Sequence, residues 1–196
     1  MASRVKVKQI SSGNEPLGKV LVSDGNSGLT FYDINIIGSG TTFPSTPTGG
    51  TLFYRTDVDL LFQYDYSRSK WLTIDSHTLN CGRATAIAGS TIYMRVGDAT
   101  QNSTSGFRMI RNGTIIGASI QNTNVLTSAR NIEIRVNNSS VNSVTLNIAI
   151  GQSGASVDNS NLDFNQGDLI QVAAIPGLTG SALSNPIVVI KIAYRV

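Results

Sequence analysis

The chain has 196 residues and a formal net charge of +3, and only 14% of its residues are charged. Ser, Thr and Asn together number 58, whereas Glu occurs twice, which argues against a helical protein because helices expose long charged side chains. One His and one Cys allow neither an intrachain disulfide nor a His/Cys metal cluster, and 40% apolar residues are too many for a disordered chain.

The charge distribution and hydropathy also limit the partners of the chain. The sequence pI of about 9.2 comes from a small Arg excess spread along a nearly uncharged chain, so no nucleic-acid partner is expected. No apolar run approaches the ~20 residues of a membrane span, and the N-terminus lacks the apolar segment of a signal peptide. We therefore expect no membrane contact, and synthesis in a reducing cytoplasm, which suits a single free cysteine.

Residues 1–42 consist of short apolar segments separated by turns. The first segment covers residues 4–8. If it is extended, Val5 and Val7 point to one side, and the basic residues Arg4, Lys6 and Lys8 point to the other. Strands are predicted at 18–22 and 29–37. None of these segments is long enough to bury a core, so this zone needs a partner, either its own copies or another protein.

Residues 43–80 begin with a Pro- and Gly-rich boundary and hold most of the aromatic side chains. Three strands are predicted, joined by turns at 57–59 and 67–69: 51–56, 60–66 and 70–74. Such a small meander has little interior, so its rings are expected to pack the meander and a core between subunits: Phe53, Tyr54, Phe62, Tyr64 and Trp71. The alternative is that exposed rings, including Tyr66, bind sugar by stacking.

Residues 81–196 contain eight strand-like segments: 84–88, 91–96, 107–110, 114–121, 131–137, 141–150, 169–175 and 186–194. Alternation predicts one buried face in three of them: Ile132, Ile134 and Val136; Val144, Leu146, Ile148 and Ile150; and Ile190, Ile192 and Tyr194. The Asn112-Gly113 pair predicts a hairpin turn. The fold class is therefore all-β, with an eight-stranded antiparallel jelly-roll sandwich as the C-terminal head.

Several of these motifs resemble those of tailed-bacteriophage fibre proteins. Residues 50–57, 61–65 and 68–72 are similar to a short module that recurs in such fibres, and residues 17–28 to a motif near their start. Residues 163–168 and 186–195 look like the last strands of trimeric heads of the tumour-necrosis-factor and C1q type, and residues 111–115 like an earlier hairpin of that fold.

The resemblance implies a homotrimeric structural protein of the virion, with an anchor at 1–42, a linker meander at 43–80 and a head at 81–196. It implies that the anchor attaches to the capsid or to other virion proteins. We assign this attachment to Arg4, Val5, Lys6, Val7 and Lys8, because a row of basic side chains on an extended strand can add to a sheet edge or lie against an acidic surface; the alternative is a frayed, solvated terminus. Only about 80 residues precede the head, which favours a head fibre or capsid decoration protein. The alternative is a tail-associated receptor-binding fibre or spike, and weak adhesion to host-surface glycans is expected of either.

Catalytic chemistry finds little support in the sequence. His77 follows Asp75 and Ser76 directly, but neighbouring strand side chains point to opposite faces and cannot converge as a triad. We interpret His77 as a linker residue and Cys81 as a small buried apolar residue.

Residues 158–168 are rich in oxygen ligands: Asp158, Asp163, Asn165 and Asp168. Their spacing does not match an EF-hand, so a polar loop is expected and calcium is the less favoured reading. Asp158 and Asp163 leave paired-carboxylate hydrolysis, as in a glycan depolymerase, as the enzymatic alternative. We expect no enzyme activity, no cofactor and no metal.

Overall fold

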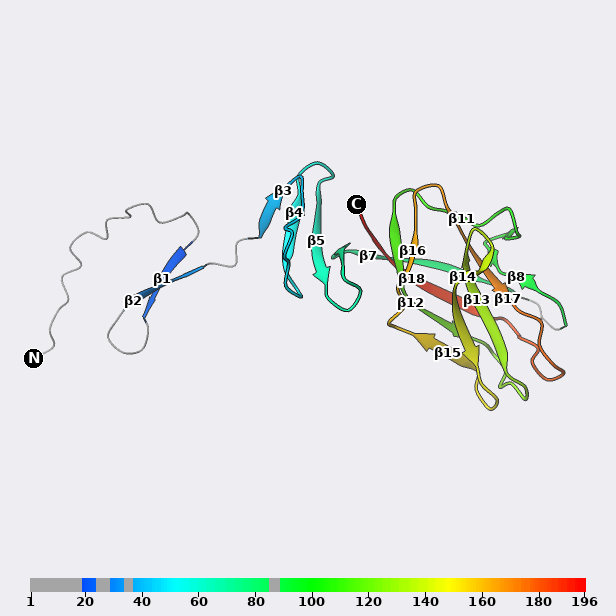
Figure 1. The fold of residues 1–196 in the computed structure, drawn as a ribbon. Coiled ribbons are helices and arrows are strands. Elements are labelled where there is room, and N and C mark those ends of the chain that lie inside the picture. Colours follow the sequence, from blue (N-terminus) through cyan, green and yellow to red (C-terminus); the bar gives the residue numbers. More distant parts are fainter. Residues whose placement is uncertain (1–18, 24–28, 34–36, 85–88) are drawn as a thin grey trace, which may run out of the picture. The chain divides into compact units, whose positions relative to one another are not determined.

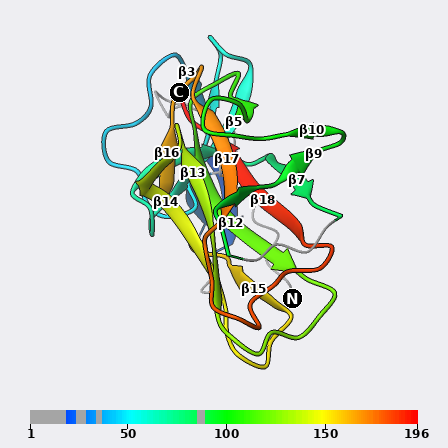
Figure 2. The ribbon, with the colours of Figure 1, turned by 90° about the vertical axis from the view of Figure 1, so that its right-hand side faces the viewer.

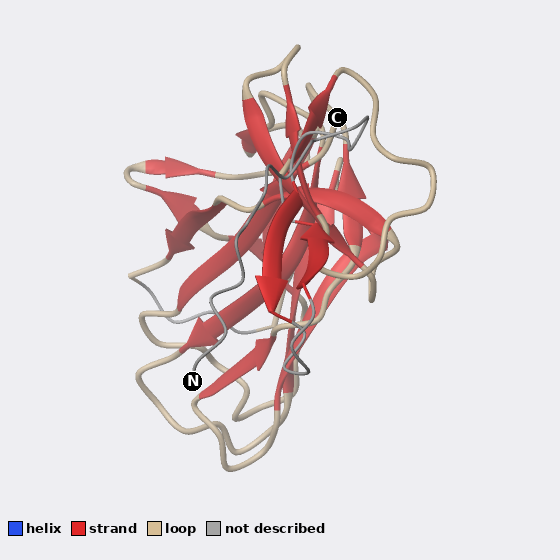
Figure 3. Cartoon of the chain, turned by 90° about the vertical axis from the view of Figure 1, so that its left-hand side faces the viewer, coloured by secondary structure: helices blue, strands red, loops and turns tan. Residues whose placement is uncertain are grey.

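The computed structural model describes residues 19–23, 29–33, 37–84 and 89–196 (Figure 1). The chain divides into two compact units, Met1–Ser39 and Gly40–Val196. The described residues form strands and loops without any helix (Figure 3), so the all-β prediction is confirmed for them. It follows that no helix in these ranges has the length and apolar character needed to cross a membrane.

The described part of the first unit is an antiparallel hairpin. Its strands are β1 (Lys19–Ser23) and β2 (Leu29–Asp33), and Lys19 lies opposite Asp33. Both strands agree with the predicted segments. The predicted anchor residues lie outside the described residues, so their role stays a prediction: Arg4, Val5, Lys6, Val7 and Lys8.

A small four-stranded sheet follows, which we call the aromatic sheet. Its strands, in spatial order, are β3 (Gly38–Gly40), β4 (Leu52–Arg55), β5 (Leu60–Asp65) and β6 (Lys70–Thr73). The three predicted strands are confirmed to within one residue at each end. The two turns between them carry residues in the left-handed region, Asp59 (φ 57°) and Ser69 (φ 52°). The sequence did not predict β3, which pairs through backbone groups alone.

The head consists of two larger antiparallel sheets. The first has seven strands: β7 (Ser76–Gly82), β9 (Arg95–Val96), β10 (Ala99–Thr100), β12 (Gly113–Gln121), β15 (Gly154–Val157), β16 (Leu162–Phe164) and β18 (Ile187–Tyr194). Its order is β10-β9-β7-β18-β12-β15, and β16 also pairs with β12. The interpretation of His77 as a linker residue is wrong, because His77 lies in β7 opposite Ile192 of β18.

The second sheet of the head has five strands: β8 (Ile92–Tyr93), β11 (Phe107–Arg108), β13 (Arg130–Val136), β14 (Ser139–Ile148) and β17 (Leu169–Ala174). Its order is β11-β17-β13-β14, and β8 also pairs with β17. The predicted strand 91–96 is divided between the two sheets, and most of the predicted strand 84–88 lies outside the described residues. The jelly-roll topology, the count of eight strands and the trimer stay predictions.

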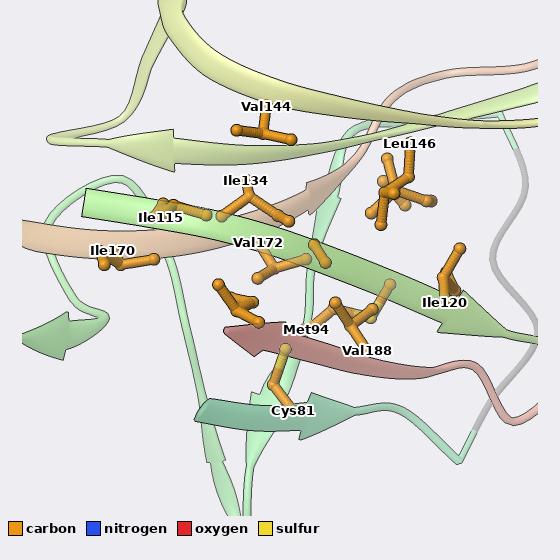
Figure 4. Packing of buried hydrophobic residues seen from close by; sticks show 14 of the residues in the cluster. Cys81, Met94, Ile115, Ile120, Ile134, Val144, Leu146, Ile170, Val172 and Val188 are labelled. Atoms are coloured by element: carbon orange, nitrogen blue, oxygen red, sulfur yellow. The ribbon is translucent and has the colours of Figure 1, made fainter. Parts of the chain in front are cut away.

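Side chains from the two sheets of the head meet in one hydrophobic core (Figure 4). Ile115 and Val188 come from the seven-stranded sheet, and Ile134 and Val172 from the five-stranded sheet, and each is fully buried. Burial of such a side chain contributes about 1.5–3 kcal/mol. The alternation predicted for β13 is confirmed. Ile150 was predicted to continue the buried row of β14, but it follows the end of that strand and is 68% exposed.

The hairpin turn predicted at Asn112-Gly113 is wrong. The preceding strand, β11, pairs with β17 in the other sheet, and Gly113 already opens β12. Glycine is needed there for a different reason, because a Cβ at Gly113 would lie 2.3 Å from the Phe164 ring. The two-residue hairpin turn lies instead between β13 and β14, where Asn137 and Asn138 have φ of 52° and 59°. Positive φ at both positions is the type I′ geometry that matches strand twist, and Asn tolerates it.

Candidate functional site

Aromatic rings fill the interior of the aromatic sheet. Phe43 stacks on Trp71, with ring centroids 4.7 Å apart and 4° between the planes. Phe53 and Phe62 meet Phe43 edge-on, with centroids 5.7 and 5.2 Å away. Such pairs contribute about 0.5–1.5 kcal/mol beyond the burial itself. Phe43 was not singled out from the sequence, because it borders the Pro- and Gly-rich boundary segment.

Of the aromatics assigned to a trimer core, Phe53 and Phe62 are buried within this single chain. Tyr64 lies edge-on to Trp71, with centroids 5.4 Å apart, and is partly exposed. The hydroxyl of Tyr54 donates a hydrogen bond to Asp59, which raises the pKa of Tyr54. The chain therefore closes much of its own aromatic interior, and a role of these residues between subunits stays a prediction.

The buried Arg55 packs against the aromatic rings of this sheet. The guanidinium of Arg55 lies 4.8 Å from the centroid of the Phe43 ring. It also donates to both carboxylate oxygens of Asp57, over 2.8 and 2.7 Å. This side-chain hydrogen bond lowers the pKa of Asp57. Arg55 thus combines a cation–π contact with a two-point ion pair, an arrangement that suits the planar guanidinium.

A second arginine joins the aromatic sheet to the head. Arg68 lies in the turn between β5 and β6, and its Nη1 is 2.5 Å from Asp65 Oδ2. The same guanidinium donates to carbonyl oxygens of the head: Ser160 at 2.8 Å, Ile116 at 3.1 Å and Asp158 at 3.4 Å. The Arg68 side chain is only 12% exposed. One side chain therefore satisfies backbone acceptors from two segments of the head.

The Ile116 carbonyl is available as an acceptor because β12 contains a bulge. Its register with β18 shifts between Ile115 and Gly117, which leaves Ile116 without a partner in β18. On its other edge, β12 pairs with β16 up to Ile115 and with β15 from Ala118 onward. Ile116 is therefore unpaired in the ladders on both edges of β12, and Arg68 donates the hydrogen bond to its carbonyl. Bulges commonly redirect backbone groups in this way.

Asp163 of β16 forms a second link between the aromatic sheet and the head. It accepts hydrogen bonds from Lys70 Nζ at 2.7 Å and Thr114 Oγ1 at 2.6 Å, and Arg195 Nε lies 3.5 Å away. Partial burial raises the pKa of Asp163, but the Lys70 and Thr114 bonds and the nearby cations outweigh it, so the pKa is lowered. Nearby, Tyr194 N donates to Thr73 Oγ1 over 3.0 Å. We call these contacts, together with those of Arg68, the junction.

The structure shows what surrounds the residues that were considered for catalysis or metal binding. Asp168, which was considered as a calcium ligand, accepts hydrogen bonds from Asn137 Nδ2 at 2.8 Å and Asn165 N at 2.7 Å. Among the described residues, no group of three or more His, Cys, Asp and Glu could hold a metal ion. His77 is exposed, with its ring 5.1 Å from that of Tyr194. Burial raises the pKa of the Cys81 thiol to about 12, which keeps it protonated and unreactive.

The outer face of the seven-stranded sheet has a recess beside Arg68. Its volume is about 510 Å³, and small uncharged side chains line much of it, among them Ser119, Ser156 and Val189. A second recess of about 420 Å³ shares these three residues and extends to Ile187, which is 59% exposed. Both recesses lie along β12, β15 and β18; the charged residues Arg68, Asp158 and Lys191 line the first recess, whereas the second is lined by uncharged residues.

No family model and no curated protein matches the chain. Among solved structures, it is similar to PRD1 vertex protein P5, with 16% identity and a TM-score of 0.38 over 79% of this chain and 86% of that one. It is also similar to the exo-beta-1,3-galactanase of Phanerochaete chrysosporium, with 15% identity and a TM-score of 0.29. The matched region spans 67% of this chain but only 32% of the galactanase. Both TM-scores are too low to establish a common fold.

Proposed function

We propose that this chain is a homotrimeric structural protein of a bacteriophage virion, a capsid fibre or decoration protein that projects its head outward. The observation that carries the proposal is the junction. Through Arg68 and Asp163 the aromatic sheet and the head belong to one compact unit, which a projecting particle component requires. The resemblance of residues 50–72 to a fibre module supports the same assignment.

The outer face of the seven-stranded sheet is the surface we assign to contacts between subunits. Ser119, Ser156 and Val189 are small and uncharged, and the second recess that they share has no charged lining residue, so three copies can approach closely there without bringing like charges together. A large cation at the centre of this uncharged area would prevent that approach. We expect Ser119→Arg to give a folded monomer, and Lys191→Ala, which changes a residue of the first recess only, to leave the trimer intact.

The proposed activity is binding without turnover. Tyr66 is 77% exposed and offers a ring on which host glycans can stack. Weak contacts of this kind gain avidity when many copies sit on one particle. Hydrolysis of host capsular polysaccharide by the purified chain would contradict this proposal.

The decisive experiments are the mass of the protein in solution and its place on the particle. A trimer is expected at micromolar concentration, and a mass near 20.8 kDa would refute the association. Electron microscopy of particles with a labelled chain is expected to place the label on the capsid, and label on the tail would favour a tail-associated spike. A chain lacking residues 1–12 is expected to fold and trimerise but to be missing from particles.

A further inference from the structure

Arg130 is a buried cation in the head. It is the first residue of β13, and its side chain points to the same side of the strand as Ile132 and Ile134, the side that faces the core. Only 1% of Arg130 is exposed. Because β13 and β17 are antiparallel, with Ile132 opposite Ala174, the start of β13 lies beside the loop 175–186 that follows β17 (Figure 2). The guanidinium is therefore enclosed at this end of the head.

The hydrogen bonds of this guanidinium are few and long. Arg130 Nη1 lies 3.5 Å from Ser181 O and 3.4 Å from Ser181 Oγ, and Nη2 lies 3.4 Å from Ser90 O. The usual N–H···O distance is about 2.9–3.0 Å. Arg130 Nε is buried and has no hydrogen-bond partner in the part of the chain that the structure describes. The guanidinium therefore has donors that these acceptors satisfy poorly or not at all.

The charge of Arg130 also lacks a partner. No carboxylate of the described residues forms an ion pair with it, whereas Arg55 and Arg68 each have one. The segments that supply its two serine contacts, residues 84–92 and 175–186, contain no Asp or Glu. Burial lowers the pKa of the Arg130 guanidinium, but an arginine stays charged at neutral pH. The head therefore encloses a positive charge without a negative one, which is among the most costly arrangements in a protein interior.

The loop after β17 packs closely around the arginine. A Cβ at Gly177 would lie 2.8 Å from Arg130 Cδ and 2.1 Å from Ser181 Oγ, so there is no room for a larger residue at this position. Ser181 is fully buried. A Cβ at Gly180 would lie 2.0 Å from Thr127 Oγ1, so the same loop is also closely packed on the loop after β12. The guanidinium therefore cannot reach solvent unless the loop after β17 opens.

We propose that Arg130 binds a small monovalent anion, chloride, inside the head. One enclosed positive charge is balanced by one negative charge, whereas a divalent anion such as sulfate would leave an excess negative charge in the same interior. An anion accepts hydrogen bonds from Nε and from the poorly bonded Nη atoms. A water molecule could accept the same bonds, but it would leave the charge unbalanced. By fixing the guanidinium, the anion stabilises its contacts with Ser181 and Ser90, which belong to the loop after β17 and to the segment before β8.

The test is the Tm of the full chain as sodium gluconate is replaced with sodium chloride at constant ionic strength. Gluconate is too large to enter an enclosed site. We expect the Tm of the wild type to rise by about 3–5 °C for each tenfold increase in chloride above its dissociation constant. Arg130→Met keeps an unbranched side chain of similar length without the charge, and its Tm should not respond to chloride. Arg111→Met, at an exposed arginine, is the matched control and should respond like the wild type.

Crystals of the wild type grown in sodium bromide give a second measurement that needs no variant. Bromide scatters anomalously and replaces chloride, so we expect an anomalous peak within hydrogen-bonding distance of the Arg130 nitrogen atoms. The proposal is overturned if wild type and Arg130→Met respond equally to chloride, if the Tm of the wild type does not respond, or if no bromide lies at Arg130. None of these outcomes depends on the trimer or on its place on the particle, so the proposed function is tested separately.

Discussion

Replacing Arg68 with methionine removes the guanidinium of the junction while keeping an unbranched side chain of similar reach. The change deletes two bonds to partly buried carbonyls, those of Ser160 and Ile116. Asp65 loses one partner but keeps the Ser67 hydroxyl and the backbone N–H of residue 68. The damage is therefore concentrated on the two carbonyls of the head.

The size of the effect follows from these contacts. Charge-assisted bonds contribute about 1.5–3 kcal/mol each, or about 3–6 kcal/mol for the two short ones. Because the Arg68 side chain is 12% exposed, its removal also relieves a desolvation cost and lets water reach the carbonyls, which offsets roughly half of that sum. We expect a net loss of about 1.5–3 kcal/mol in the free energy of unfolding, or about 3–12 °C in Tm for a chain of this size.

The assay is thermal unfolding followed by circular dichroism, with hydrogen exchange to locate the effect. Arg111→Met, at an exposed arginine, is the matched control and should leave Tm nearly unchanged. Arg68→Lys keeps the charge but not the planar fork and should fall between wild type and Arg68→Met. If Arg68→Met lowers Tm no more than Arg111→Met, or if faster exchange spares β6 and β12, the junction does not join the aromatic sheet to the head.

Three further predictions follow from the same structure. The lowered pKa of Asp163 means that its bonds stabilise the fold above the ordinary value of 3.8 and are lost as pH falls through the folded-state pKa, so Asp163→Asn should lower Tm at about pH 7, and its difference from the wild type should shrink as pH falls below 3.8; parallel curves would contradict this. Gly180→Ala should cost about 1–3 kcal/mol more in urea unfolding than Gly151→Ala, which has similar φ but open space; equal losses would show that backbone strain alone matters. Cys81, with a pKa of about 12, should resist iodoacetamide until urea unfolds the chain, and rapid labelling of the folded protein would refute its burial.

The sequence predicts the parts of the fold that depend on local alternation. The strands of the aromatic sheet and the buried face of β13 follow directly from it, because each side chain there points either inward or outward. Ile150 obeys the same pattern and is nevertheless exposed, since alternation does not show where a strand ends. The alternation therefore locates strands better than it locates their ends.

The turns were harder to assign. Asn112-Gly113 is the stronger hairpin signal. Gly113 is needed instead because the Phe164 ring packs closely against it, and the two-residue turn forms at Asn137-Asn138. His77 was placed in a linker because it directly follows the predicted meander and the first three residues of β7 are polar; pairing with β18 makes them a strand.

The junction was beyond sequence reasoning, since its residues are far apart in the chain. Arg68 is separated from Ser160 by 92 positions and Lys70 from Asp163 by 93. Each looks like an ordinary turn or loop residue by itself. The sequence did indicate that residues 158–168 are rich in oxygen acceptors, and the acceptors that matter most there are the Asp163 carboxylate and the Ser160 carbonyl.

The bulge at Ile116 has a consequence for exchanging the aromatic sheet or the head with that of another protein. A head transplanted onto a different sheet would keep the Ile116 carbonyl, but this carbonyl would lose its donor unless the new sheet carried an arginine at a turn equivalent to that of Arg68. Conversely, deleting Ile116 would restore a regular ladder and leave the guanidinium with one acceptor fewer. The turn that carries Arg68 and the bulge at Ile116 therefore have to be exchanged together, and folded chimaeras should have their crossover points before β3 and not between β6 and β7.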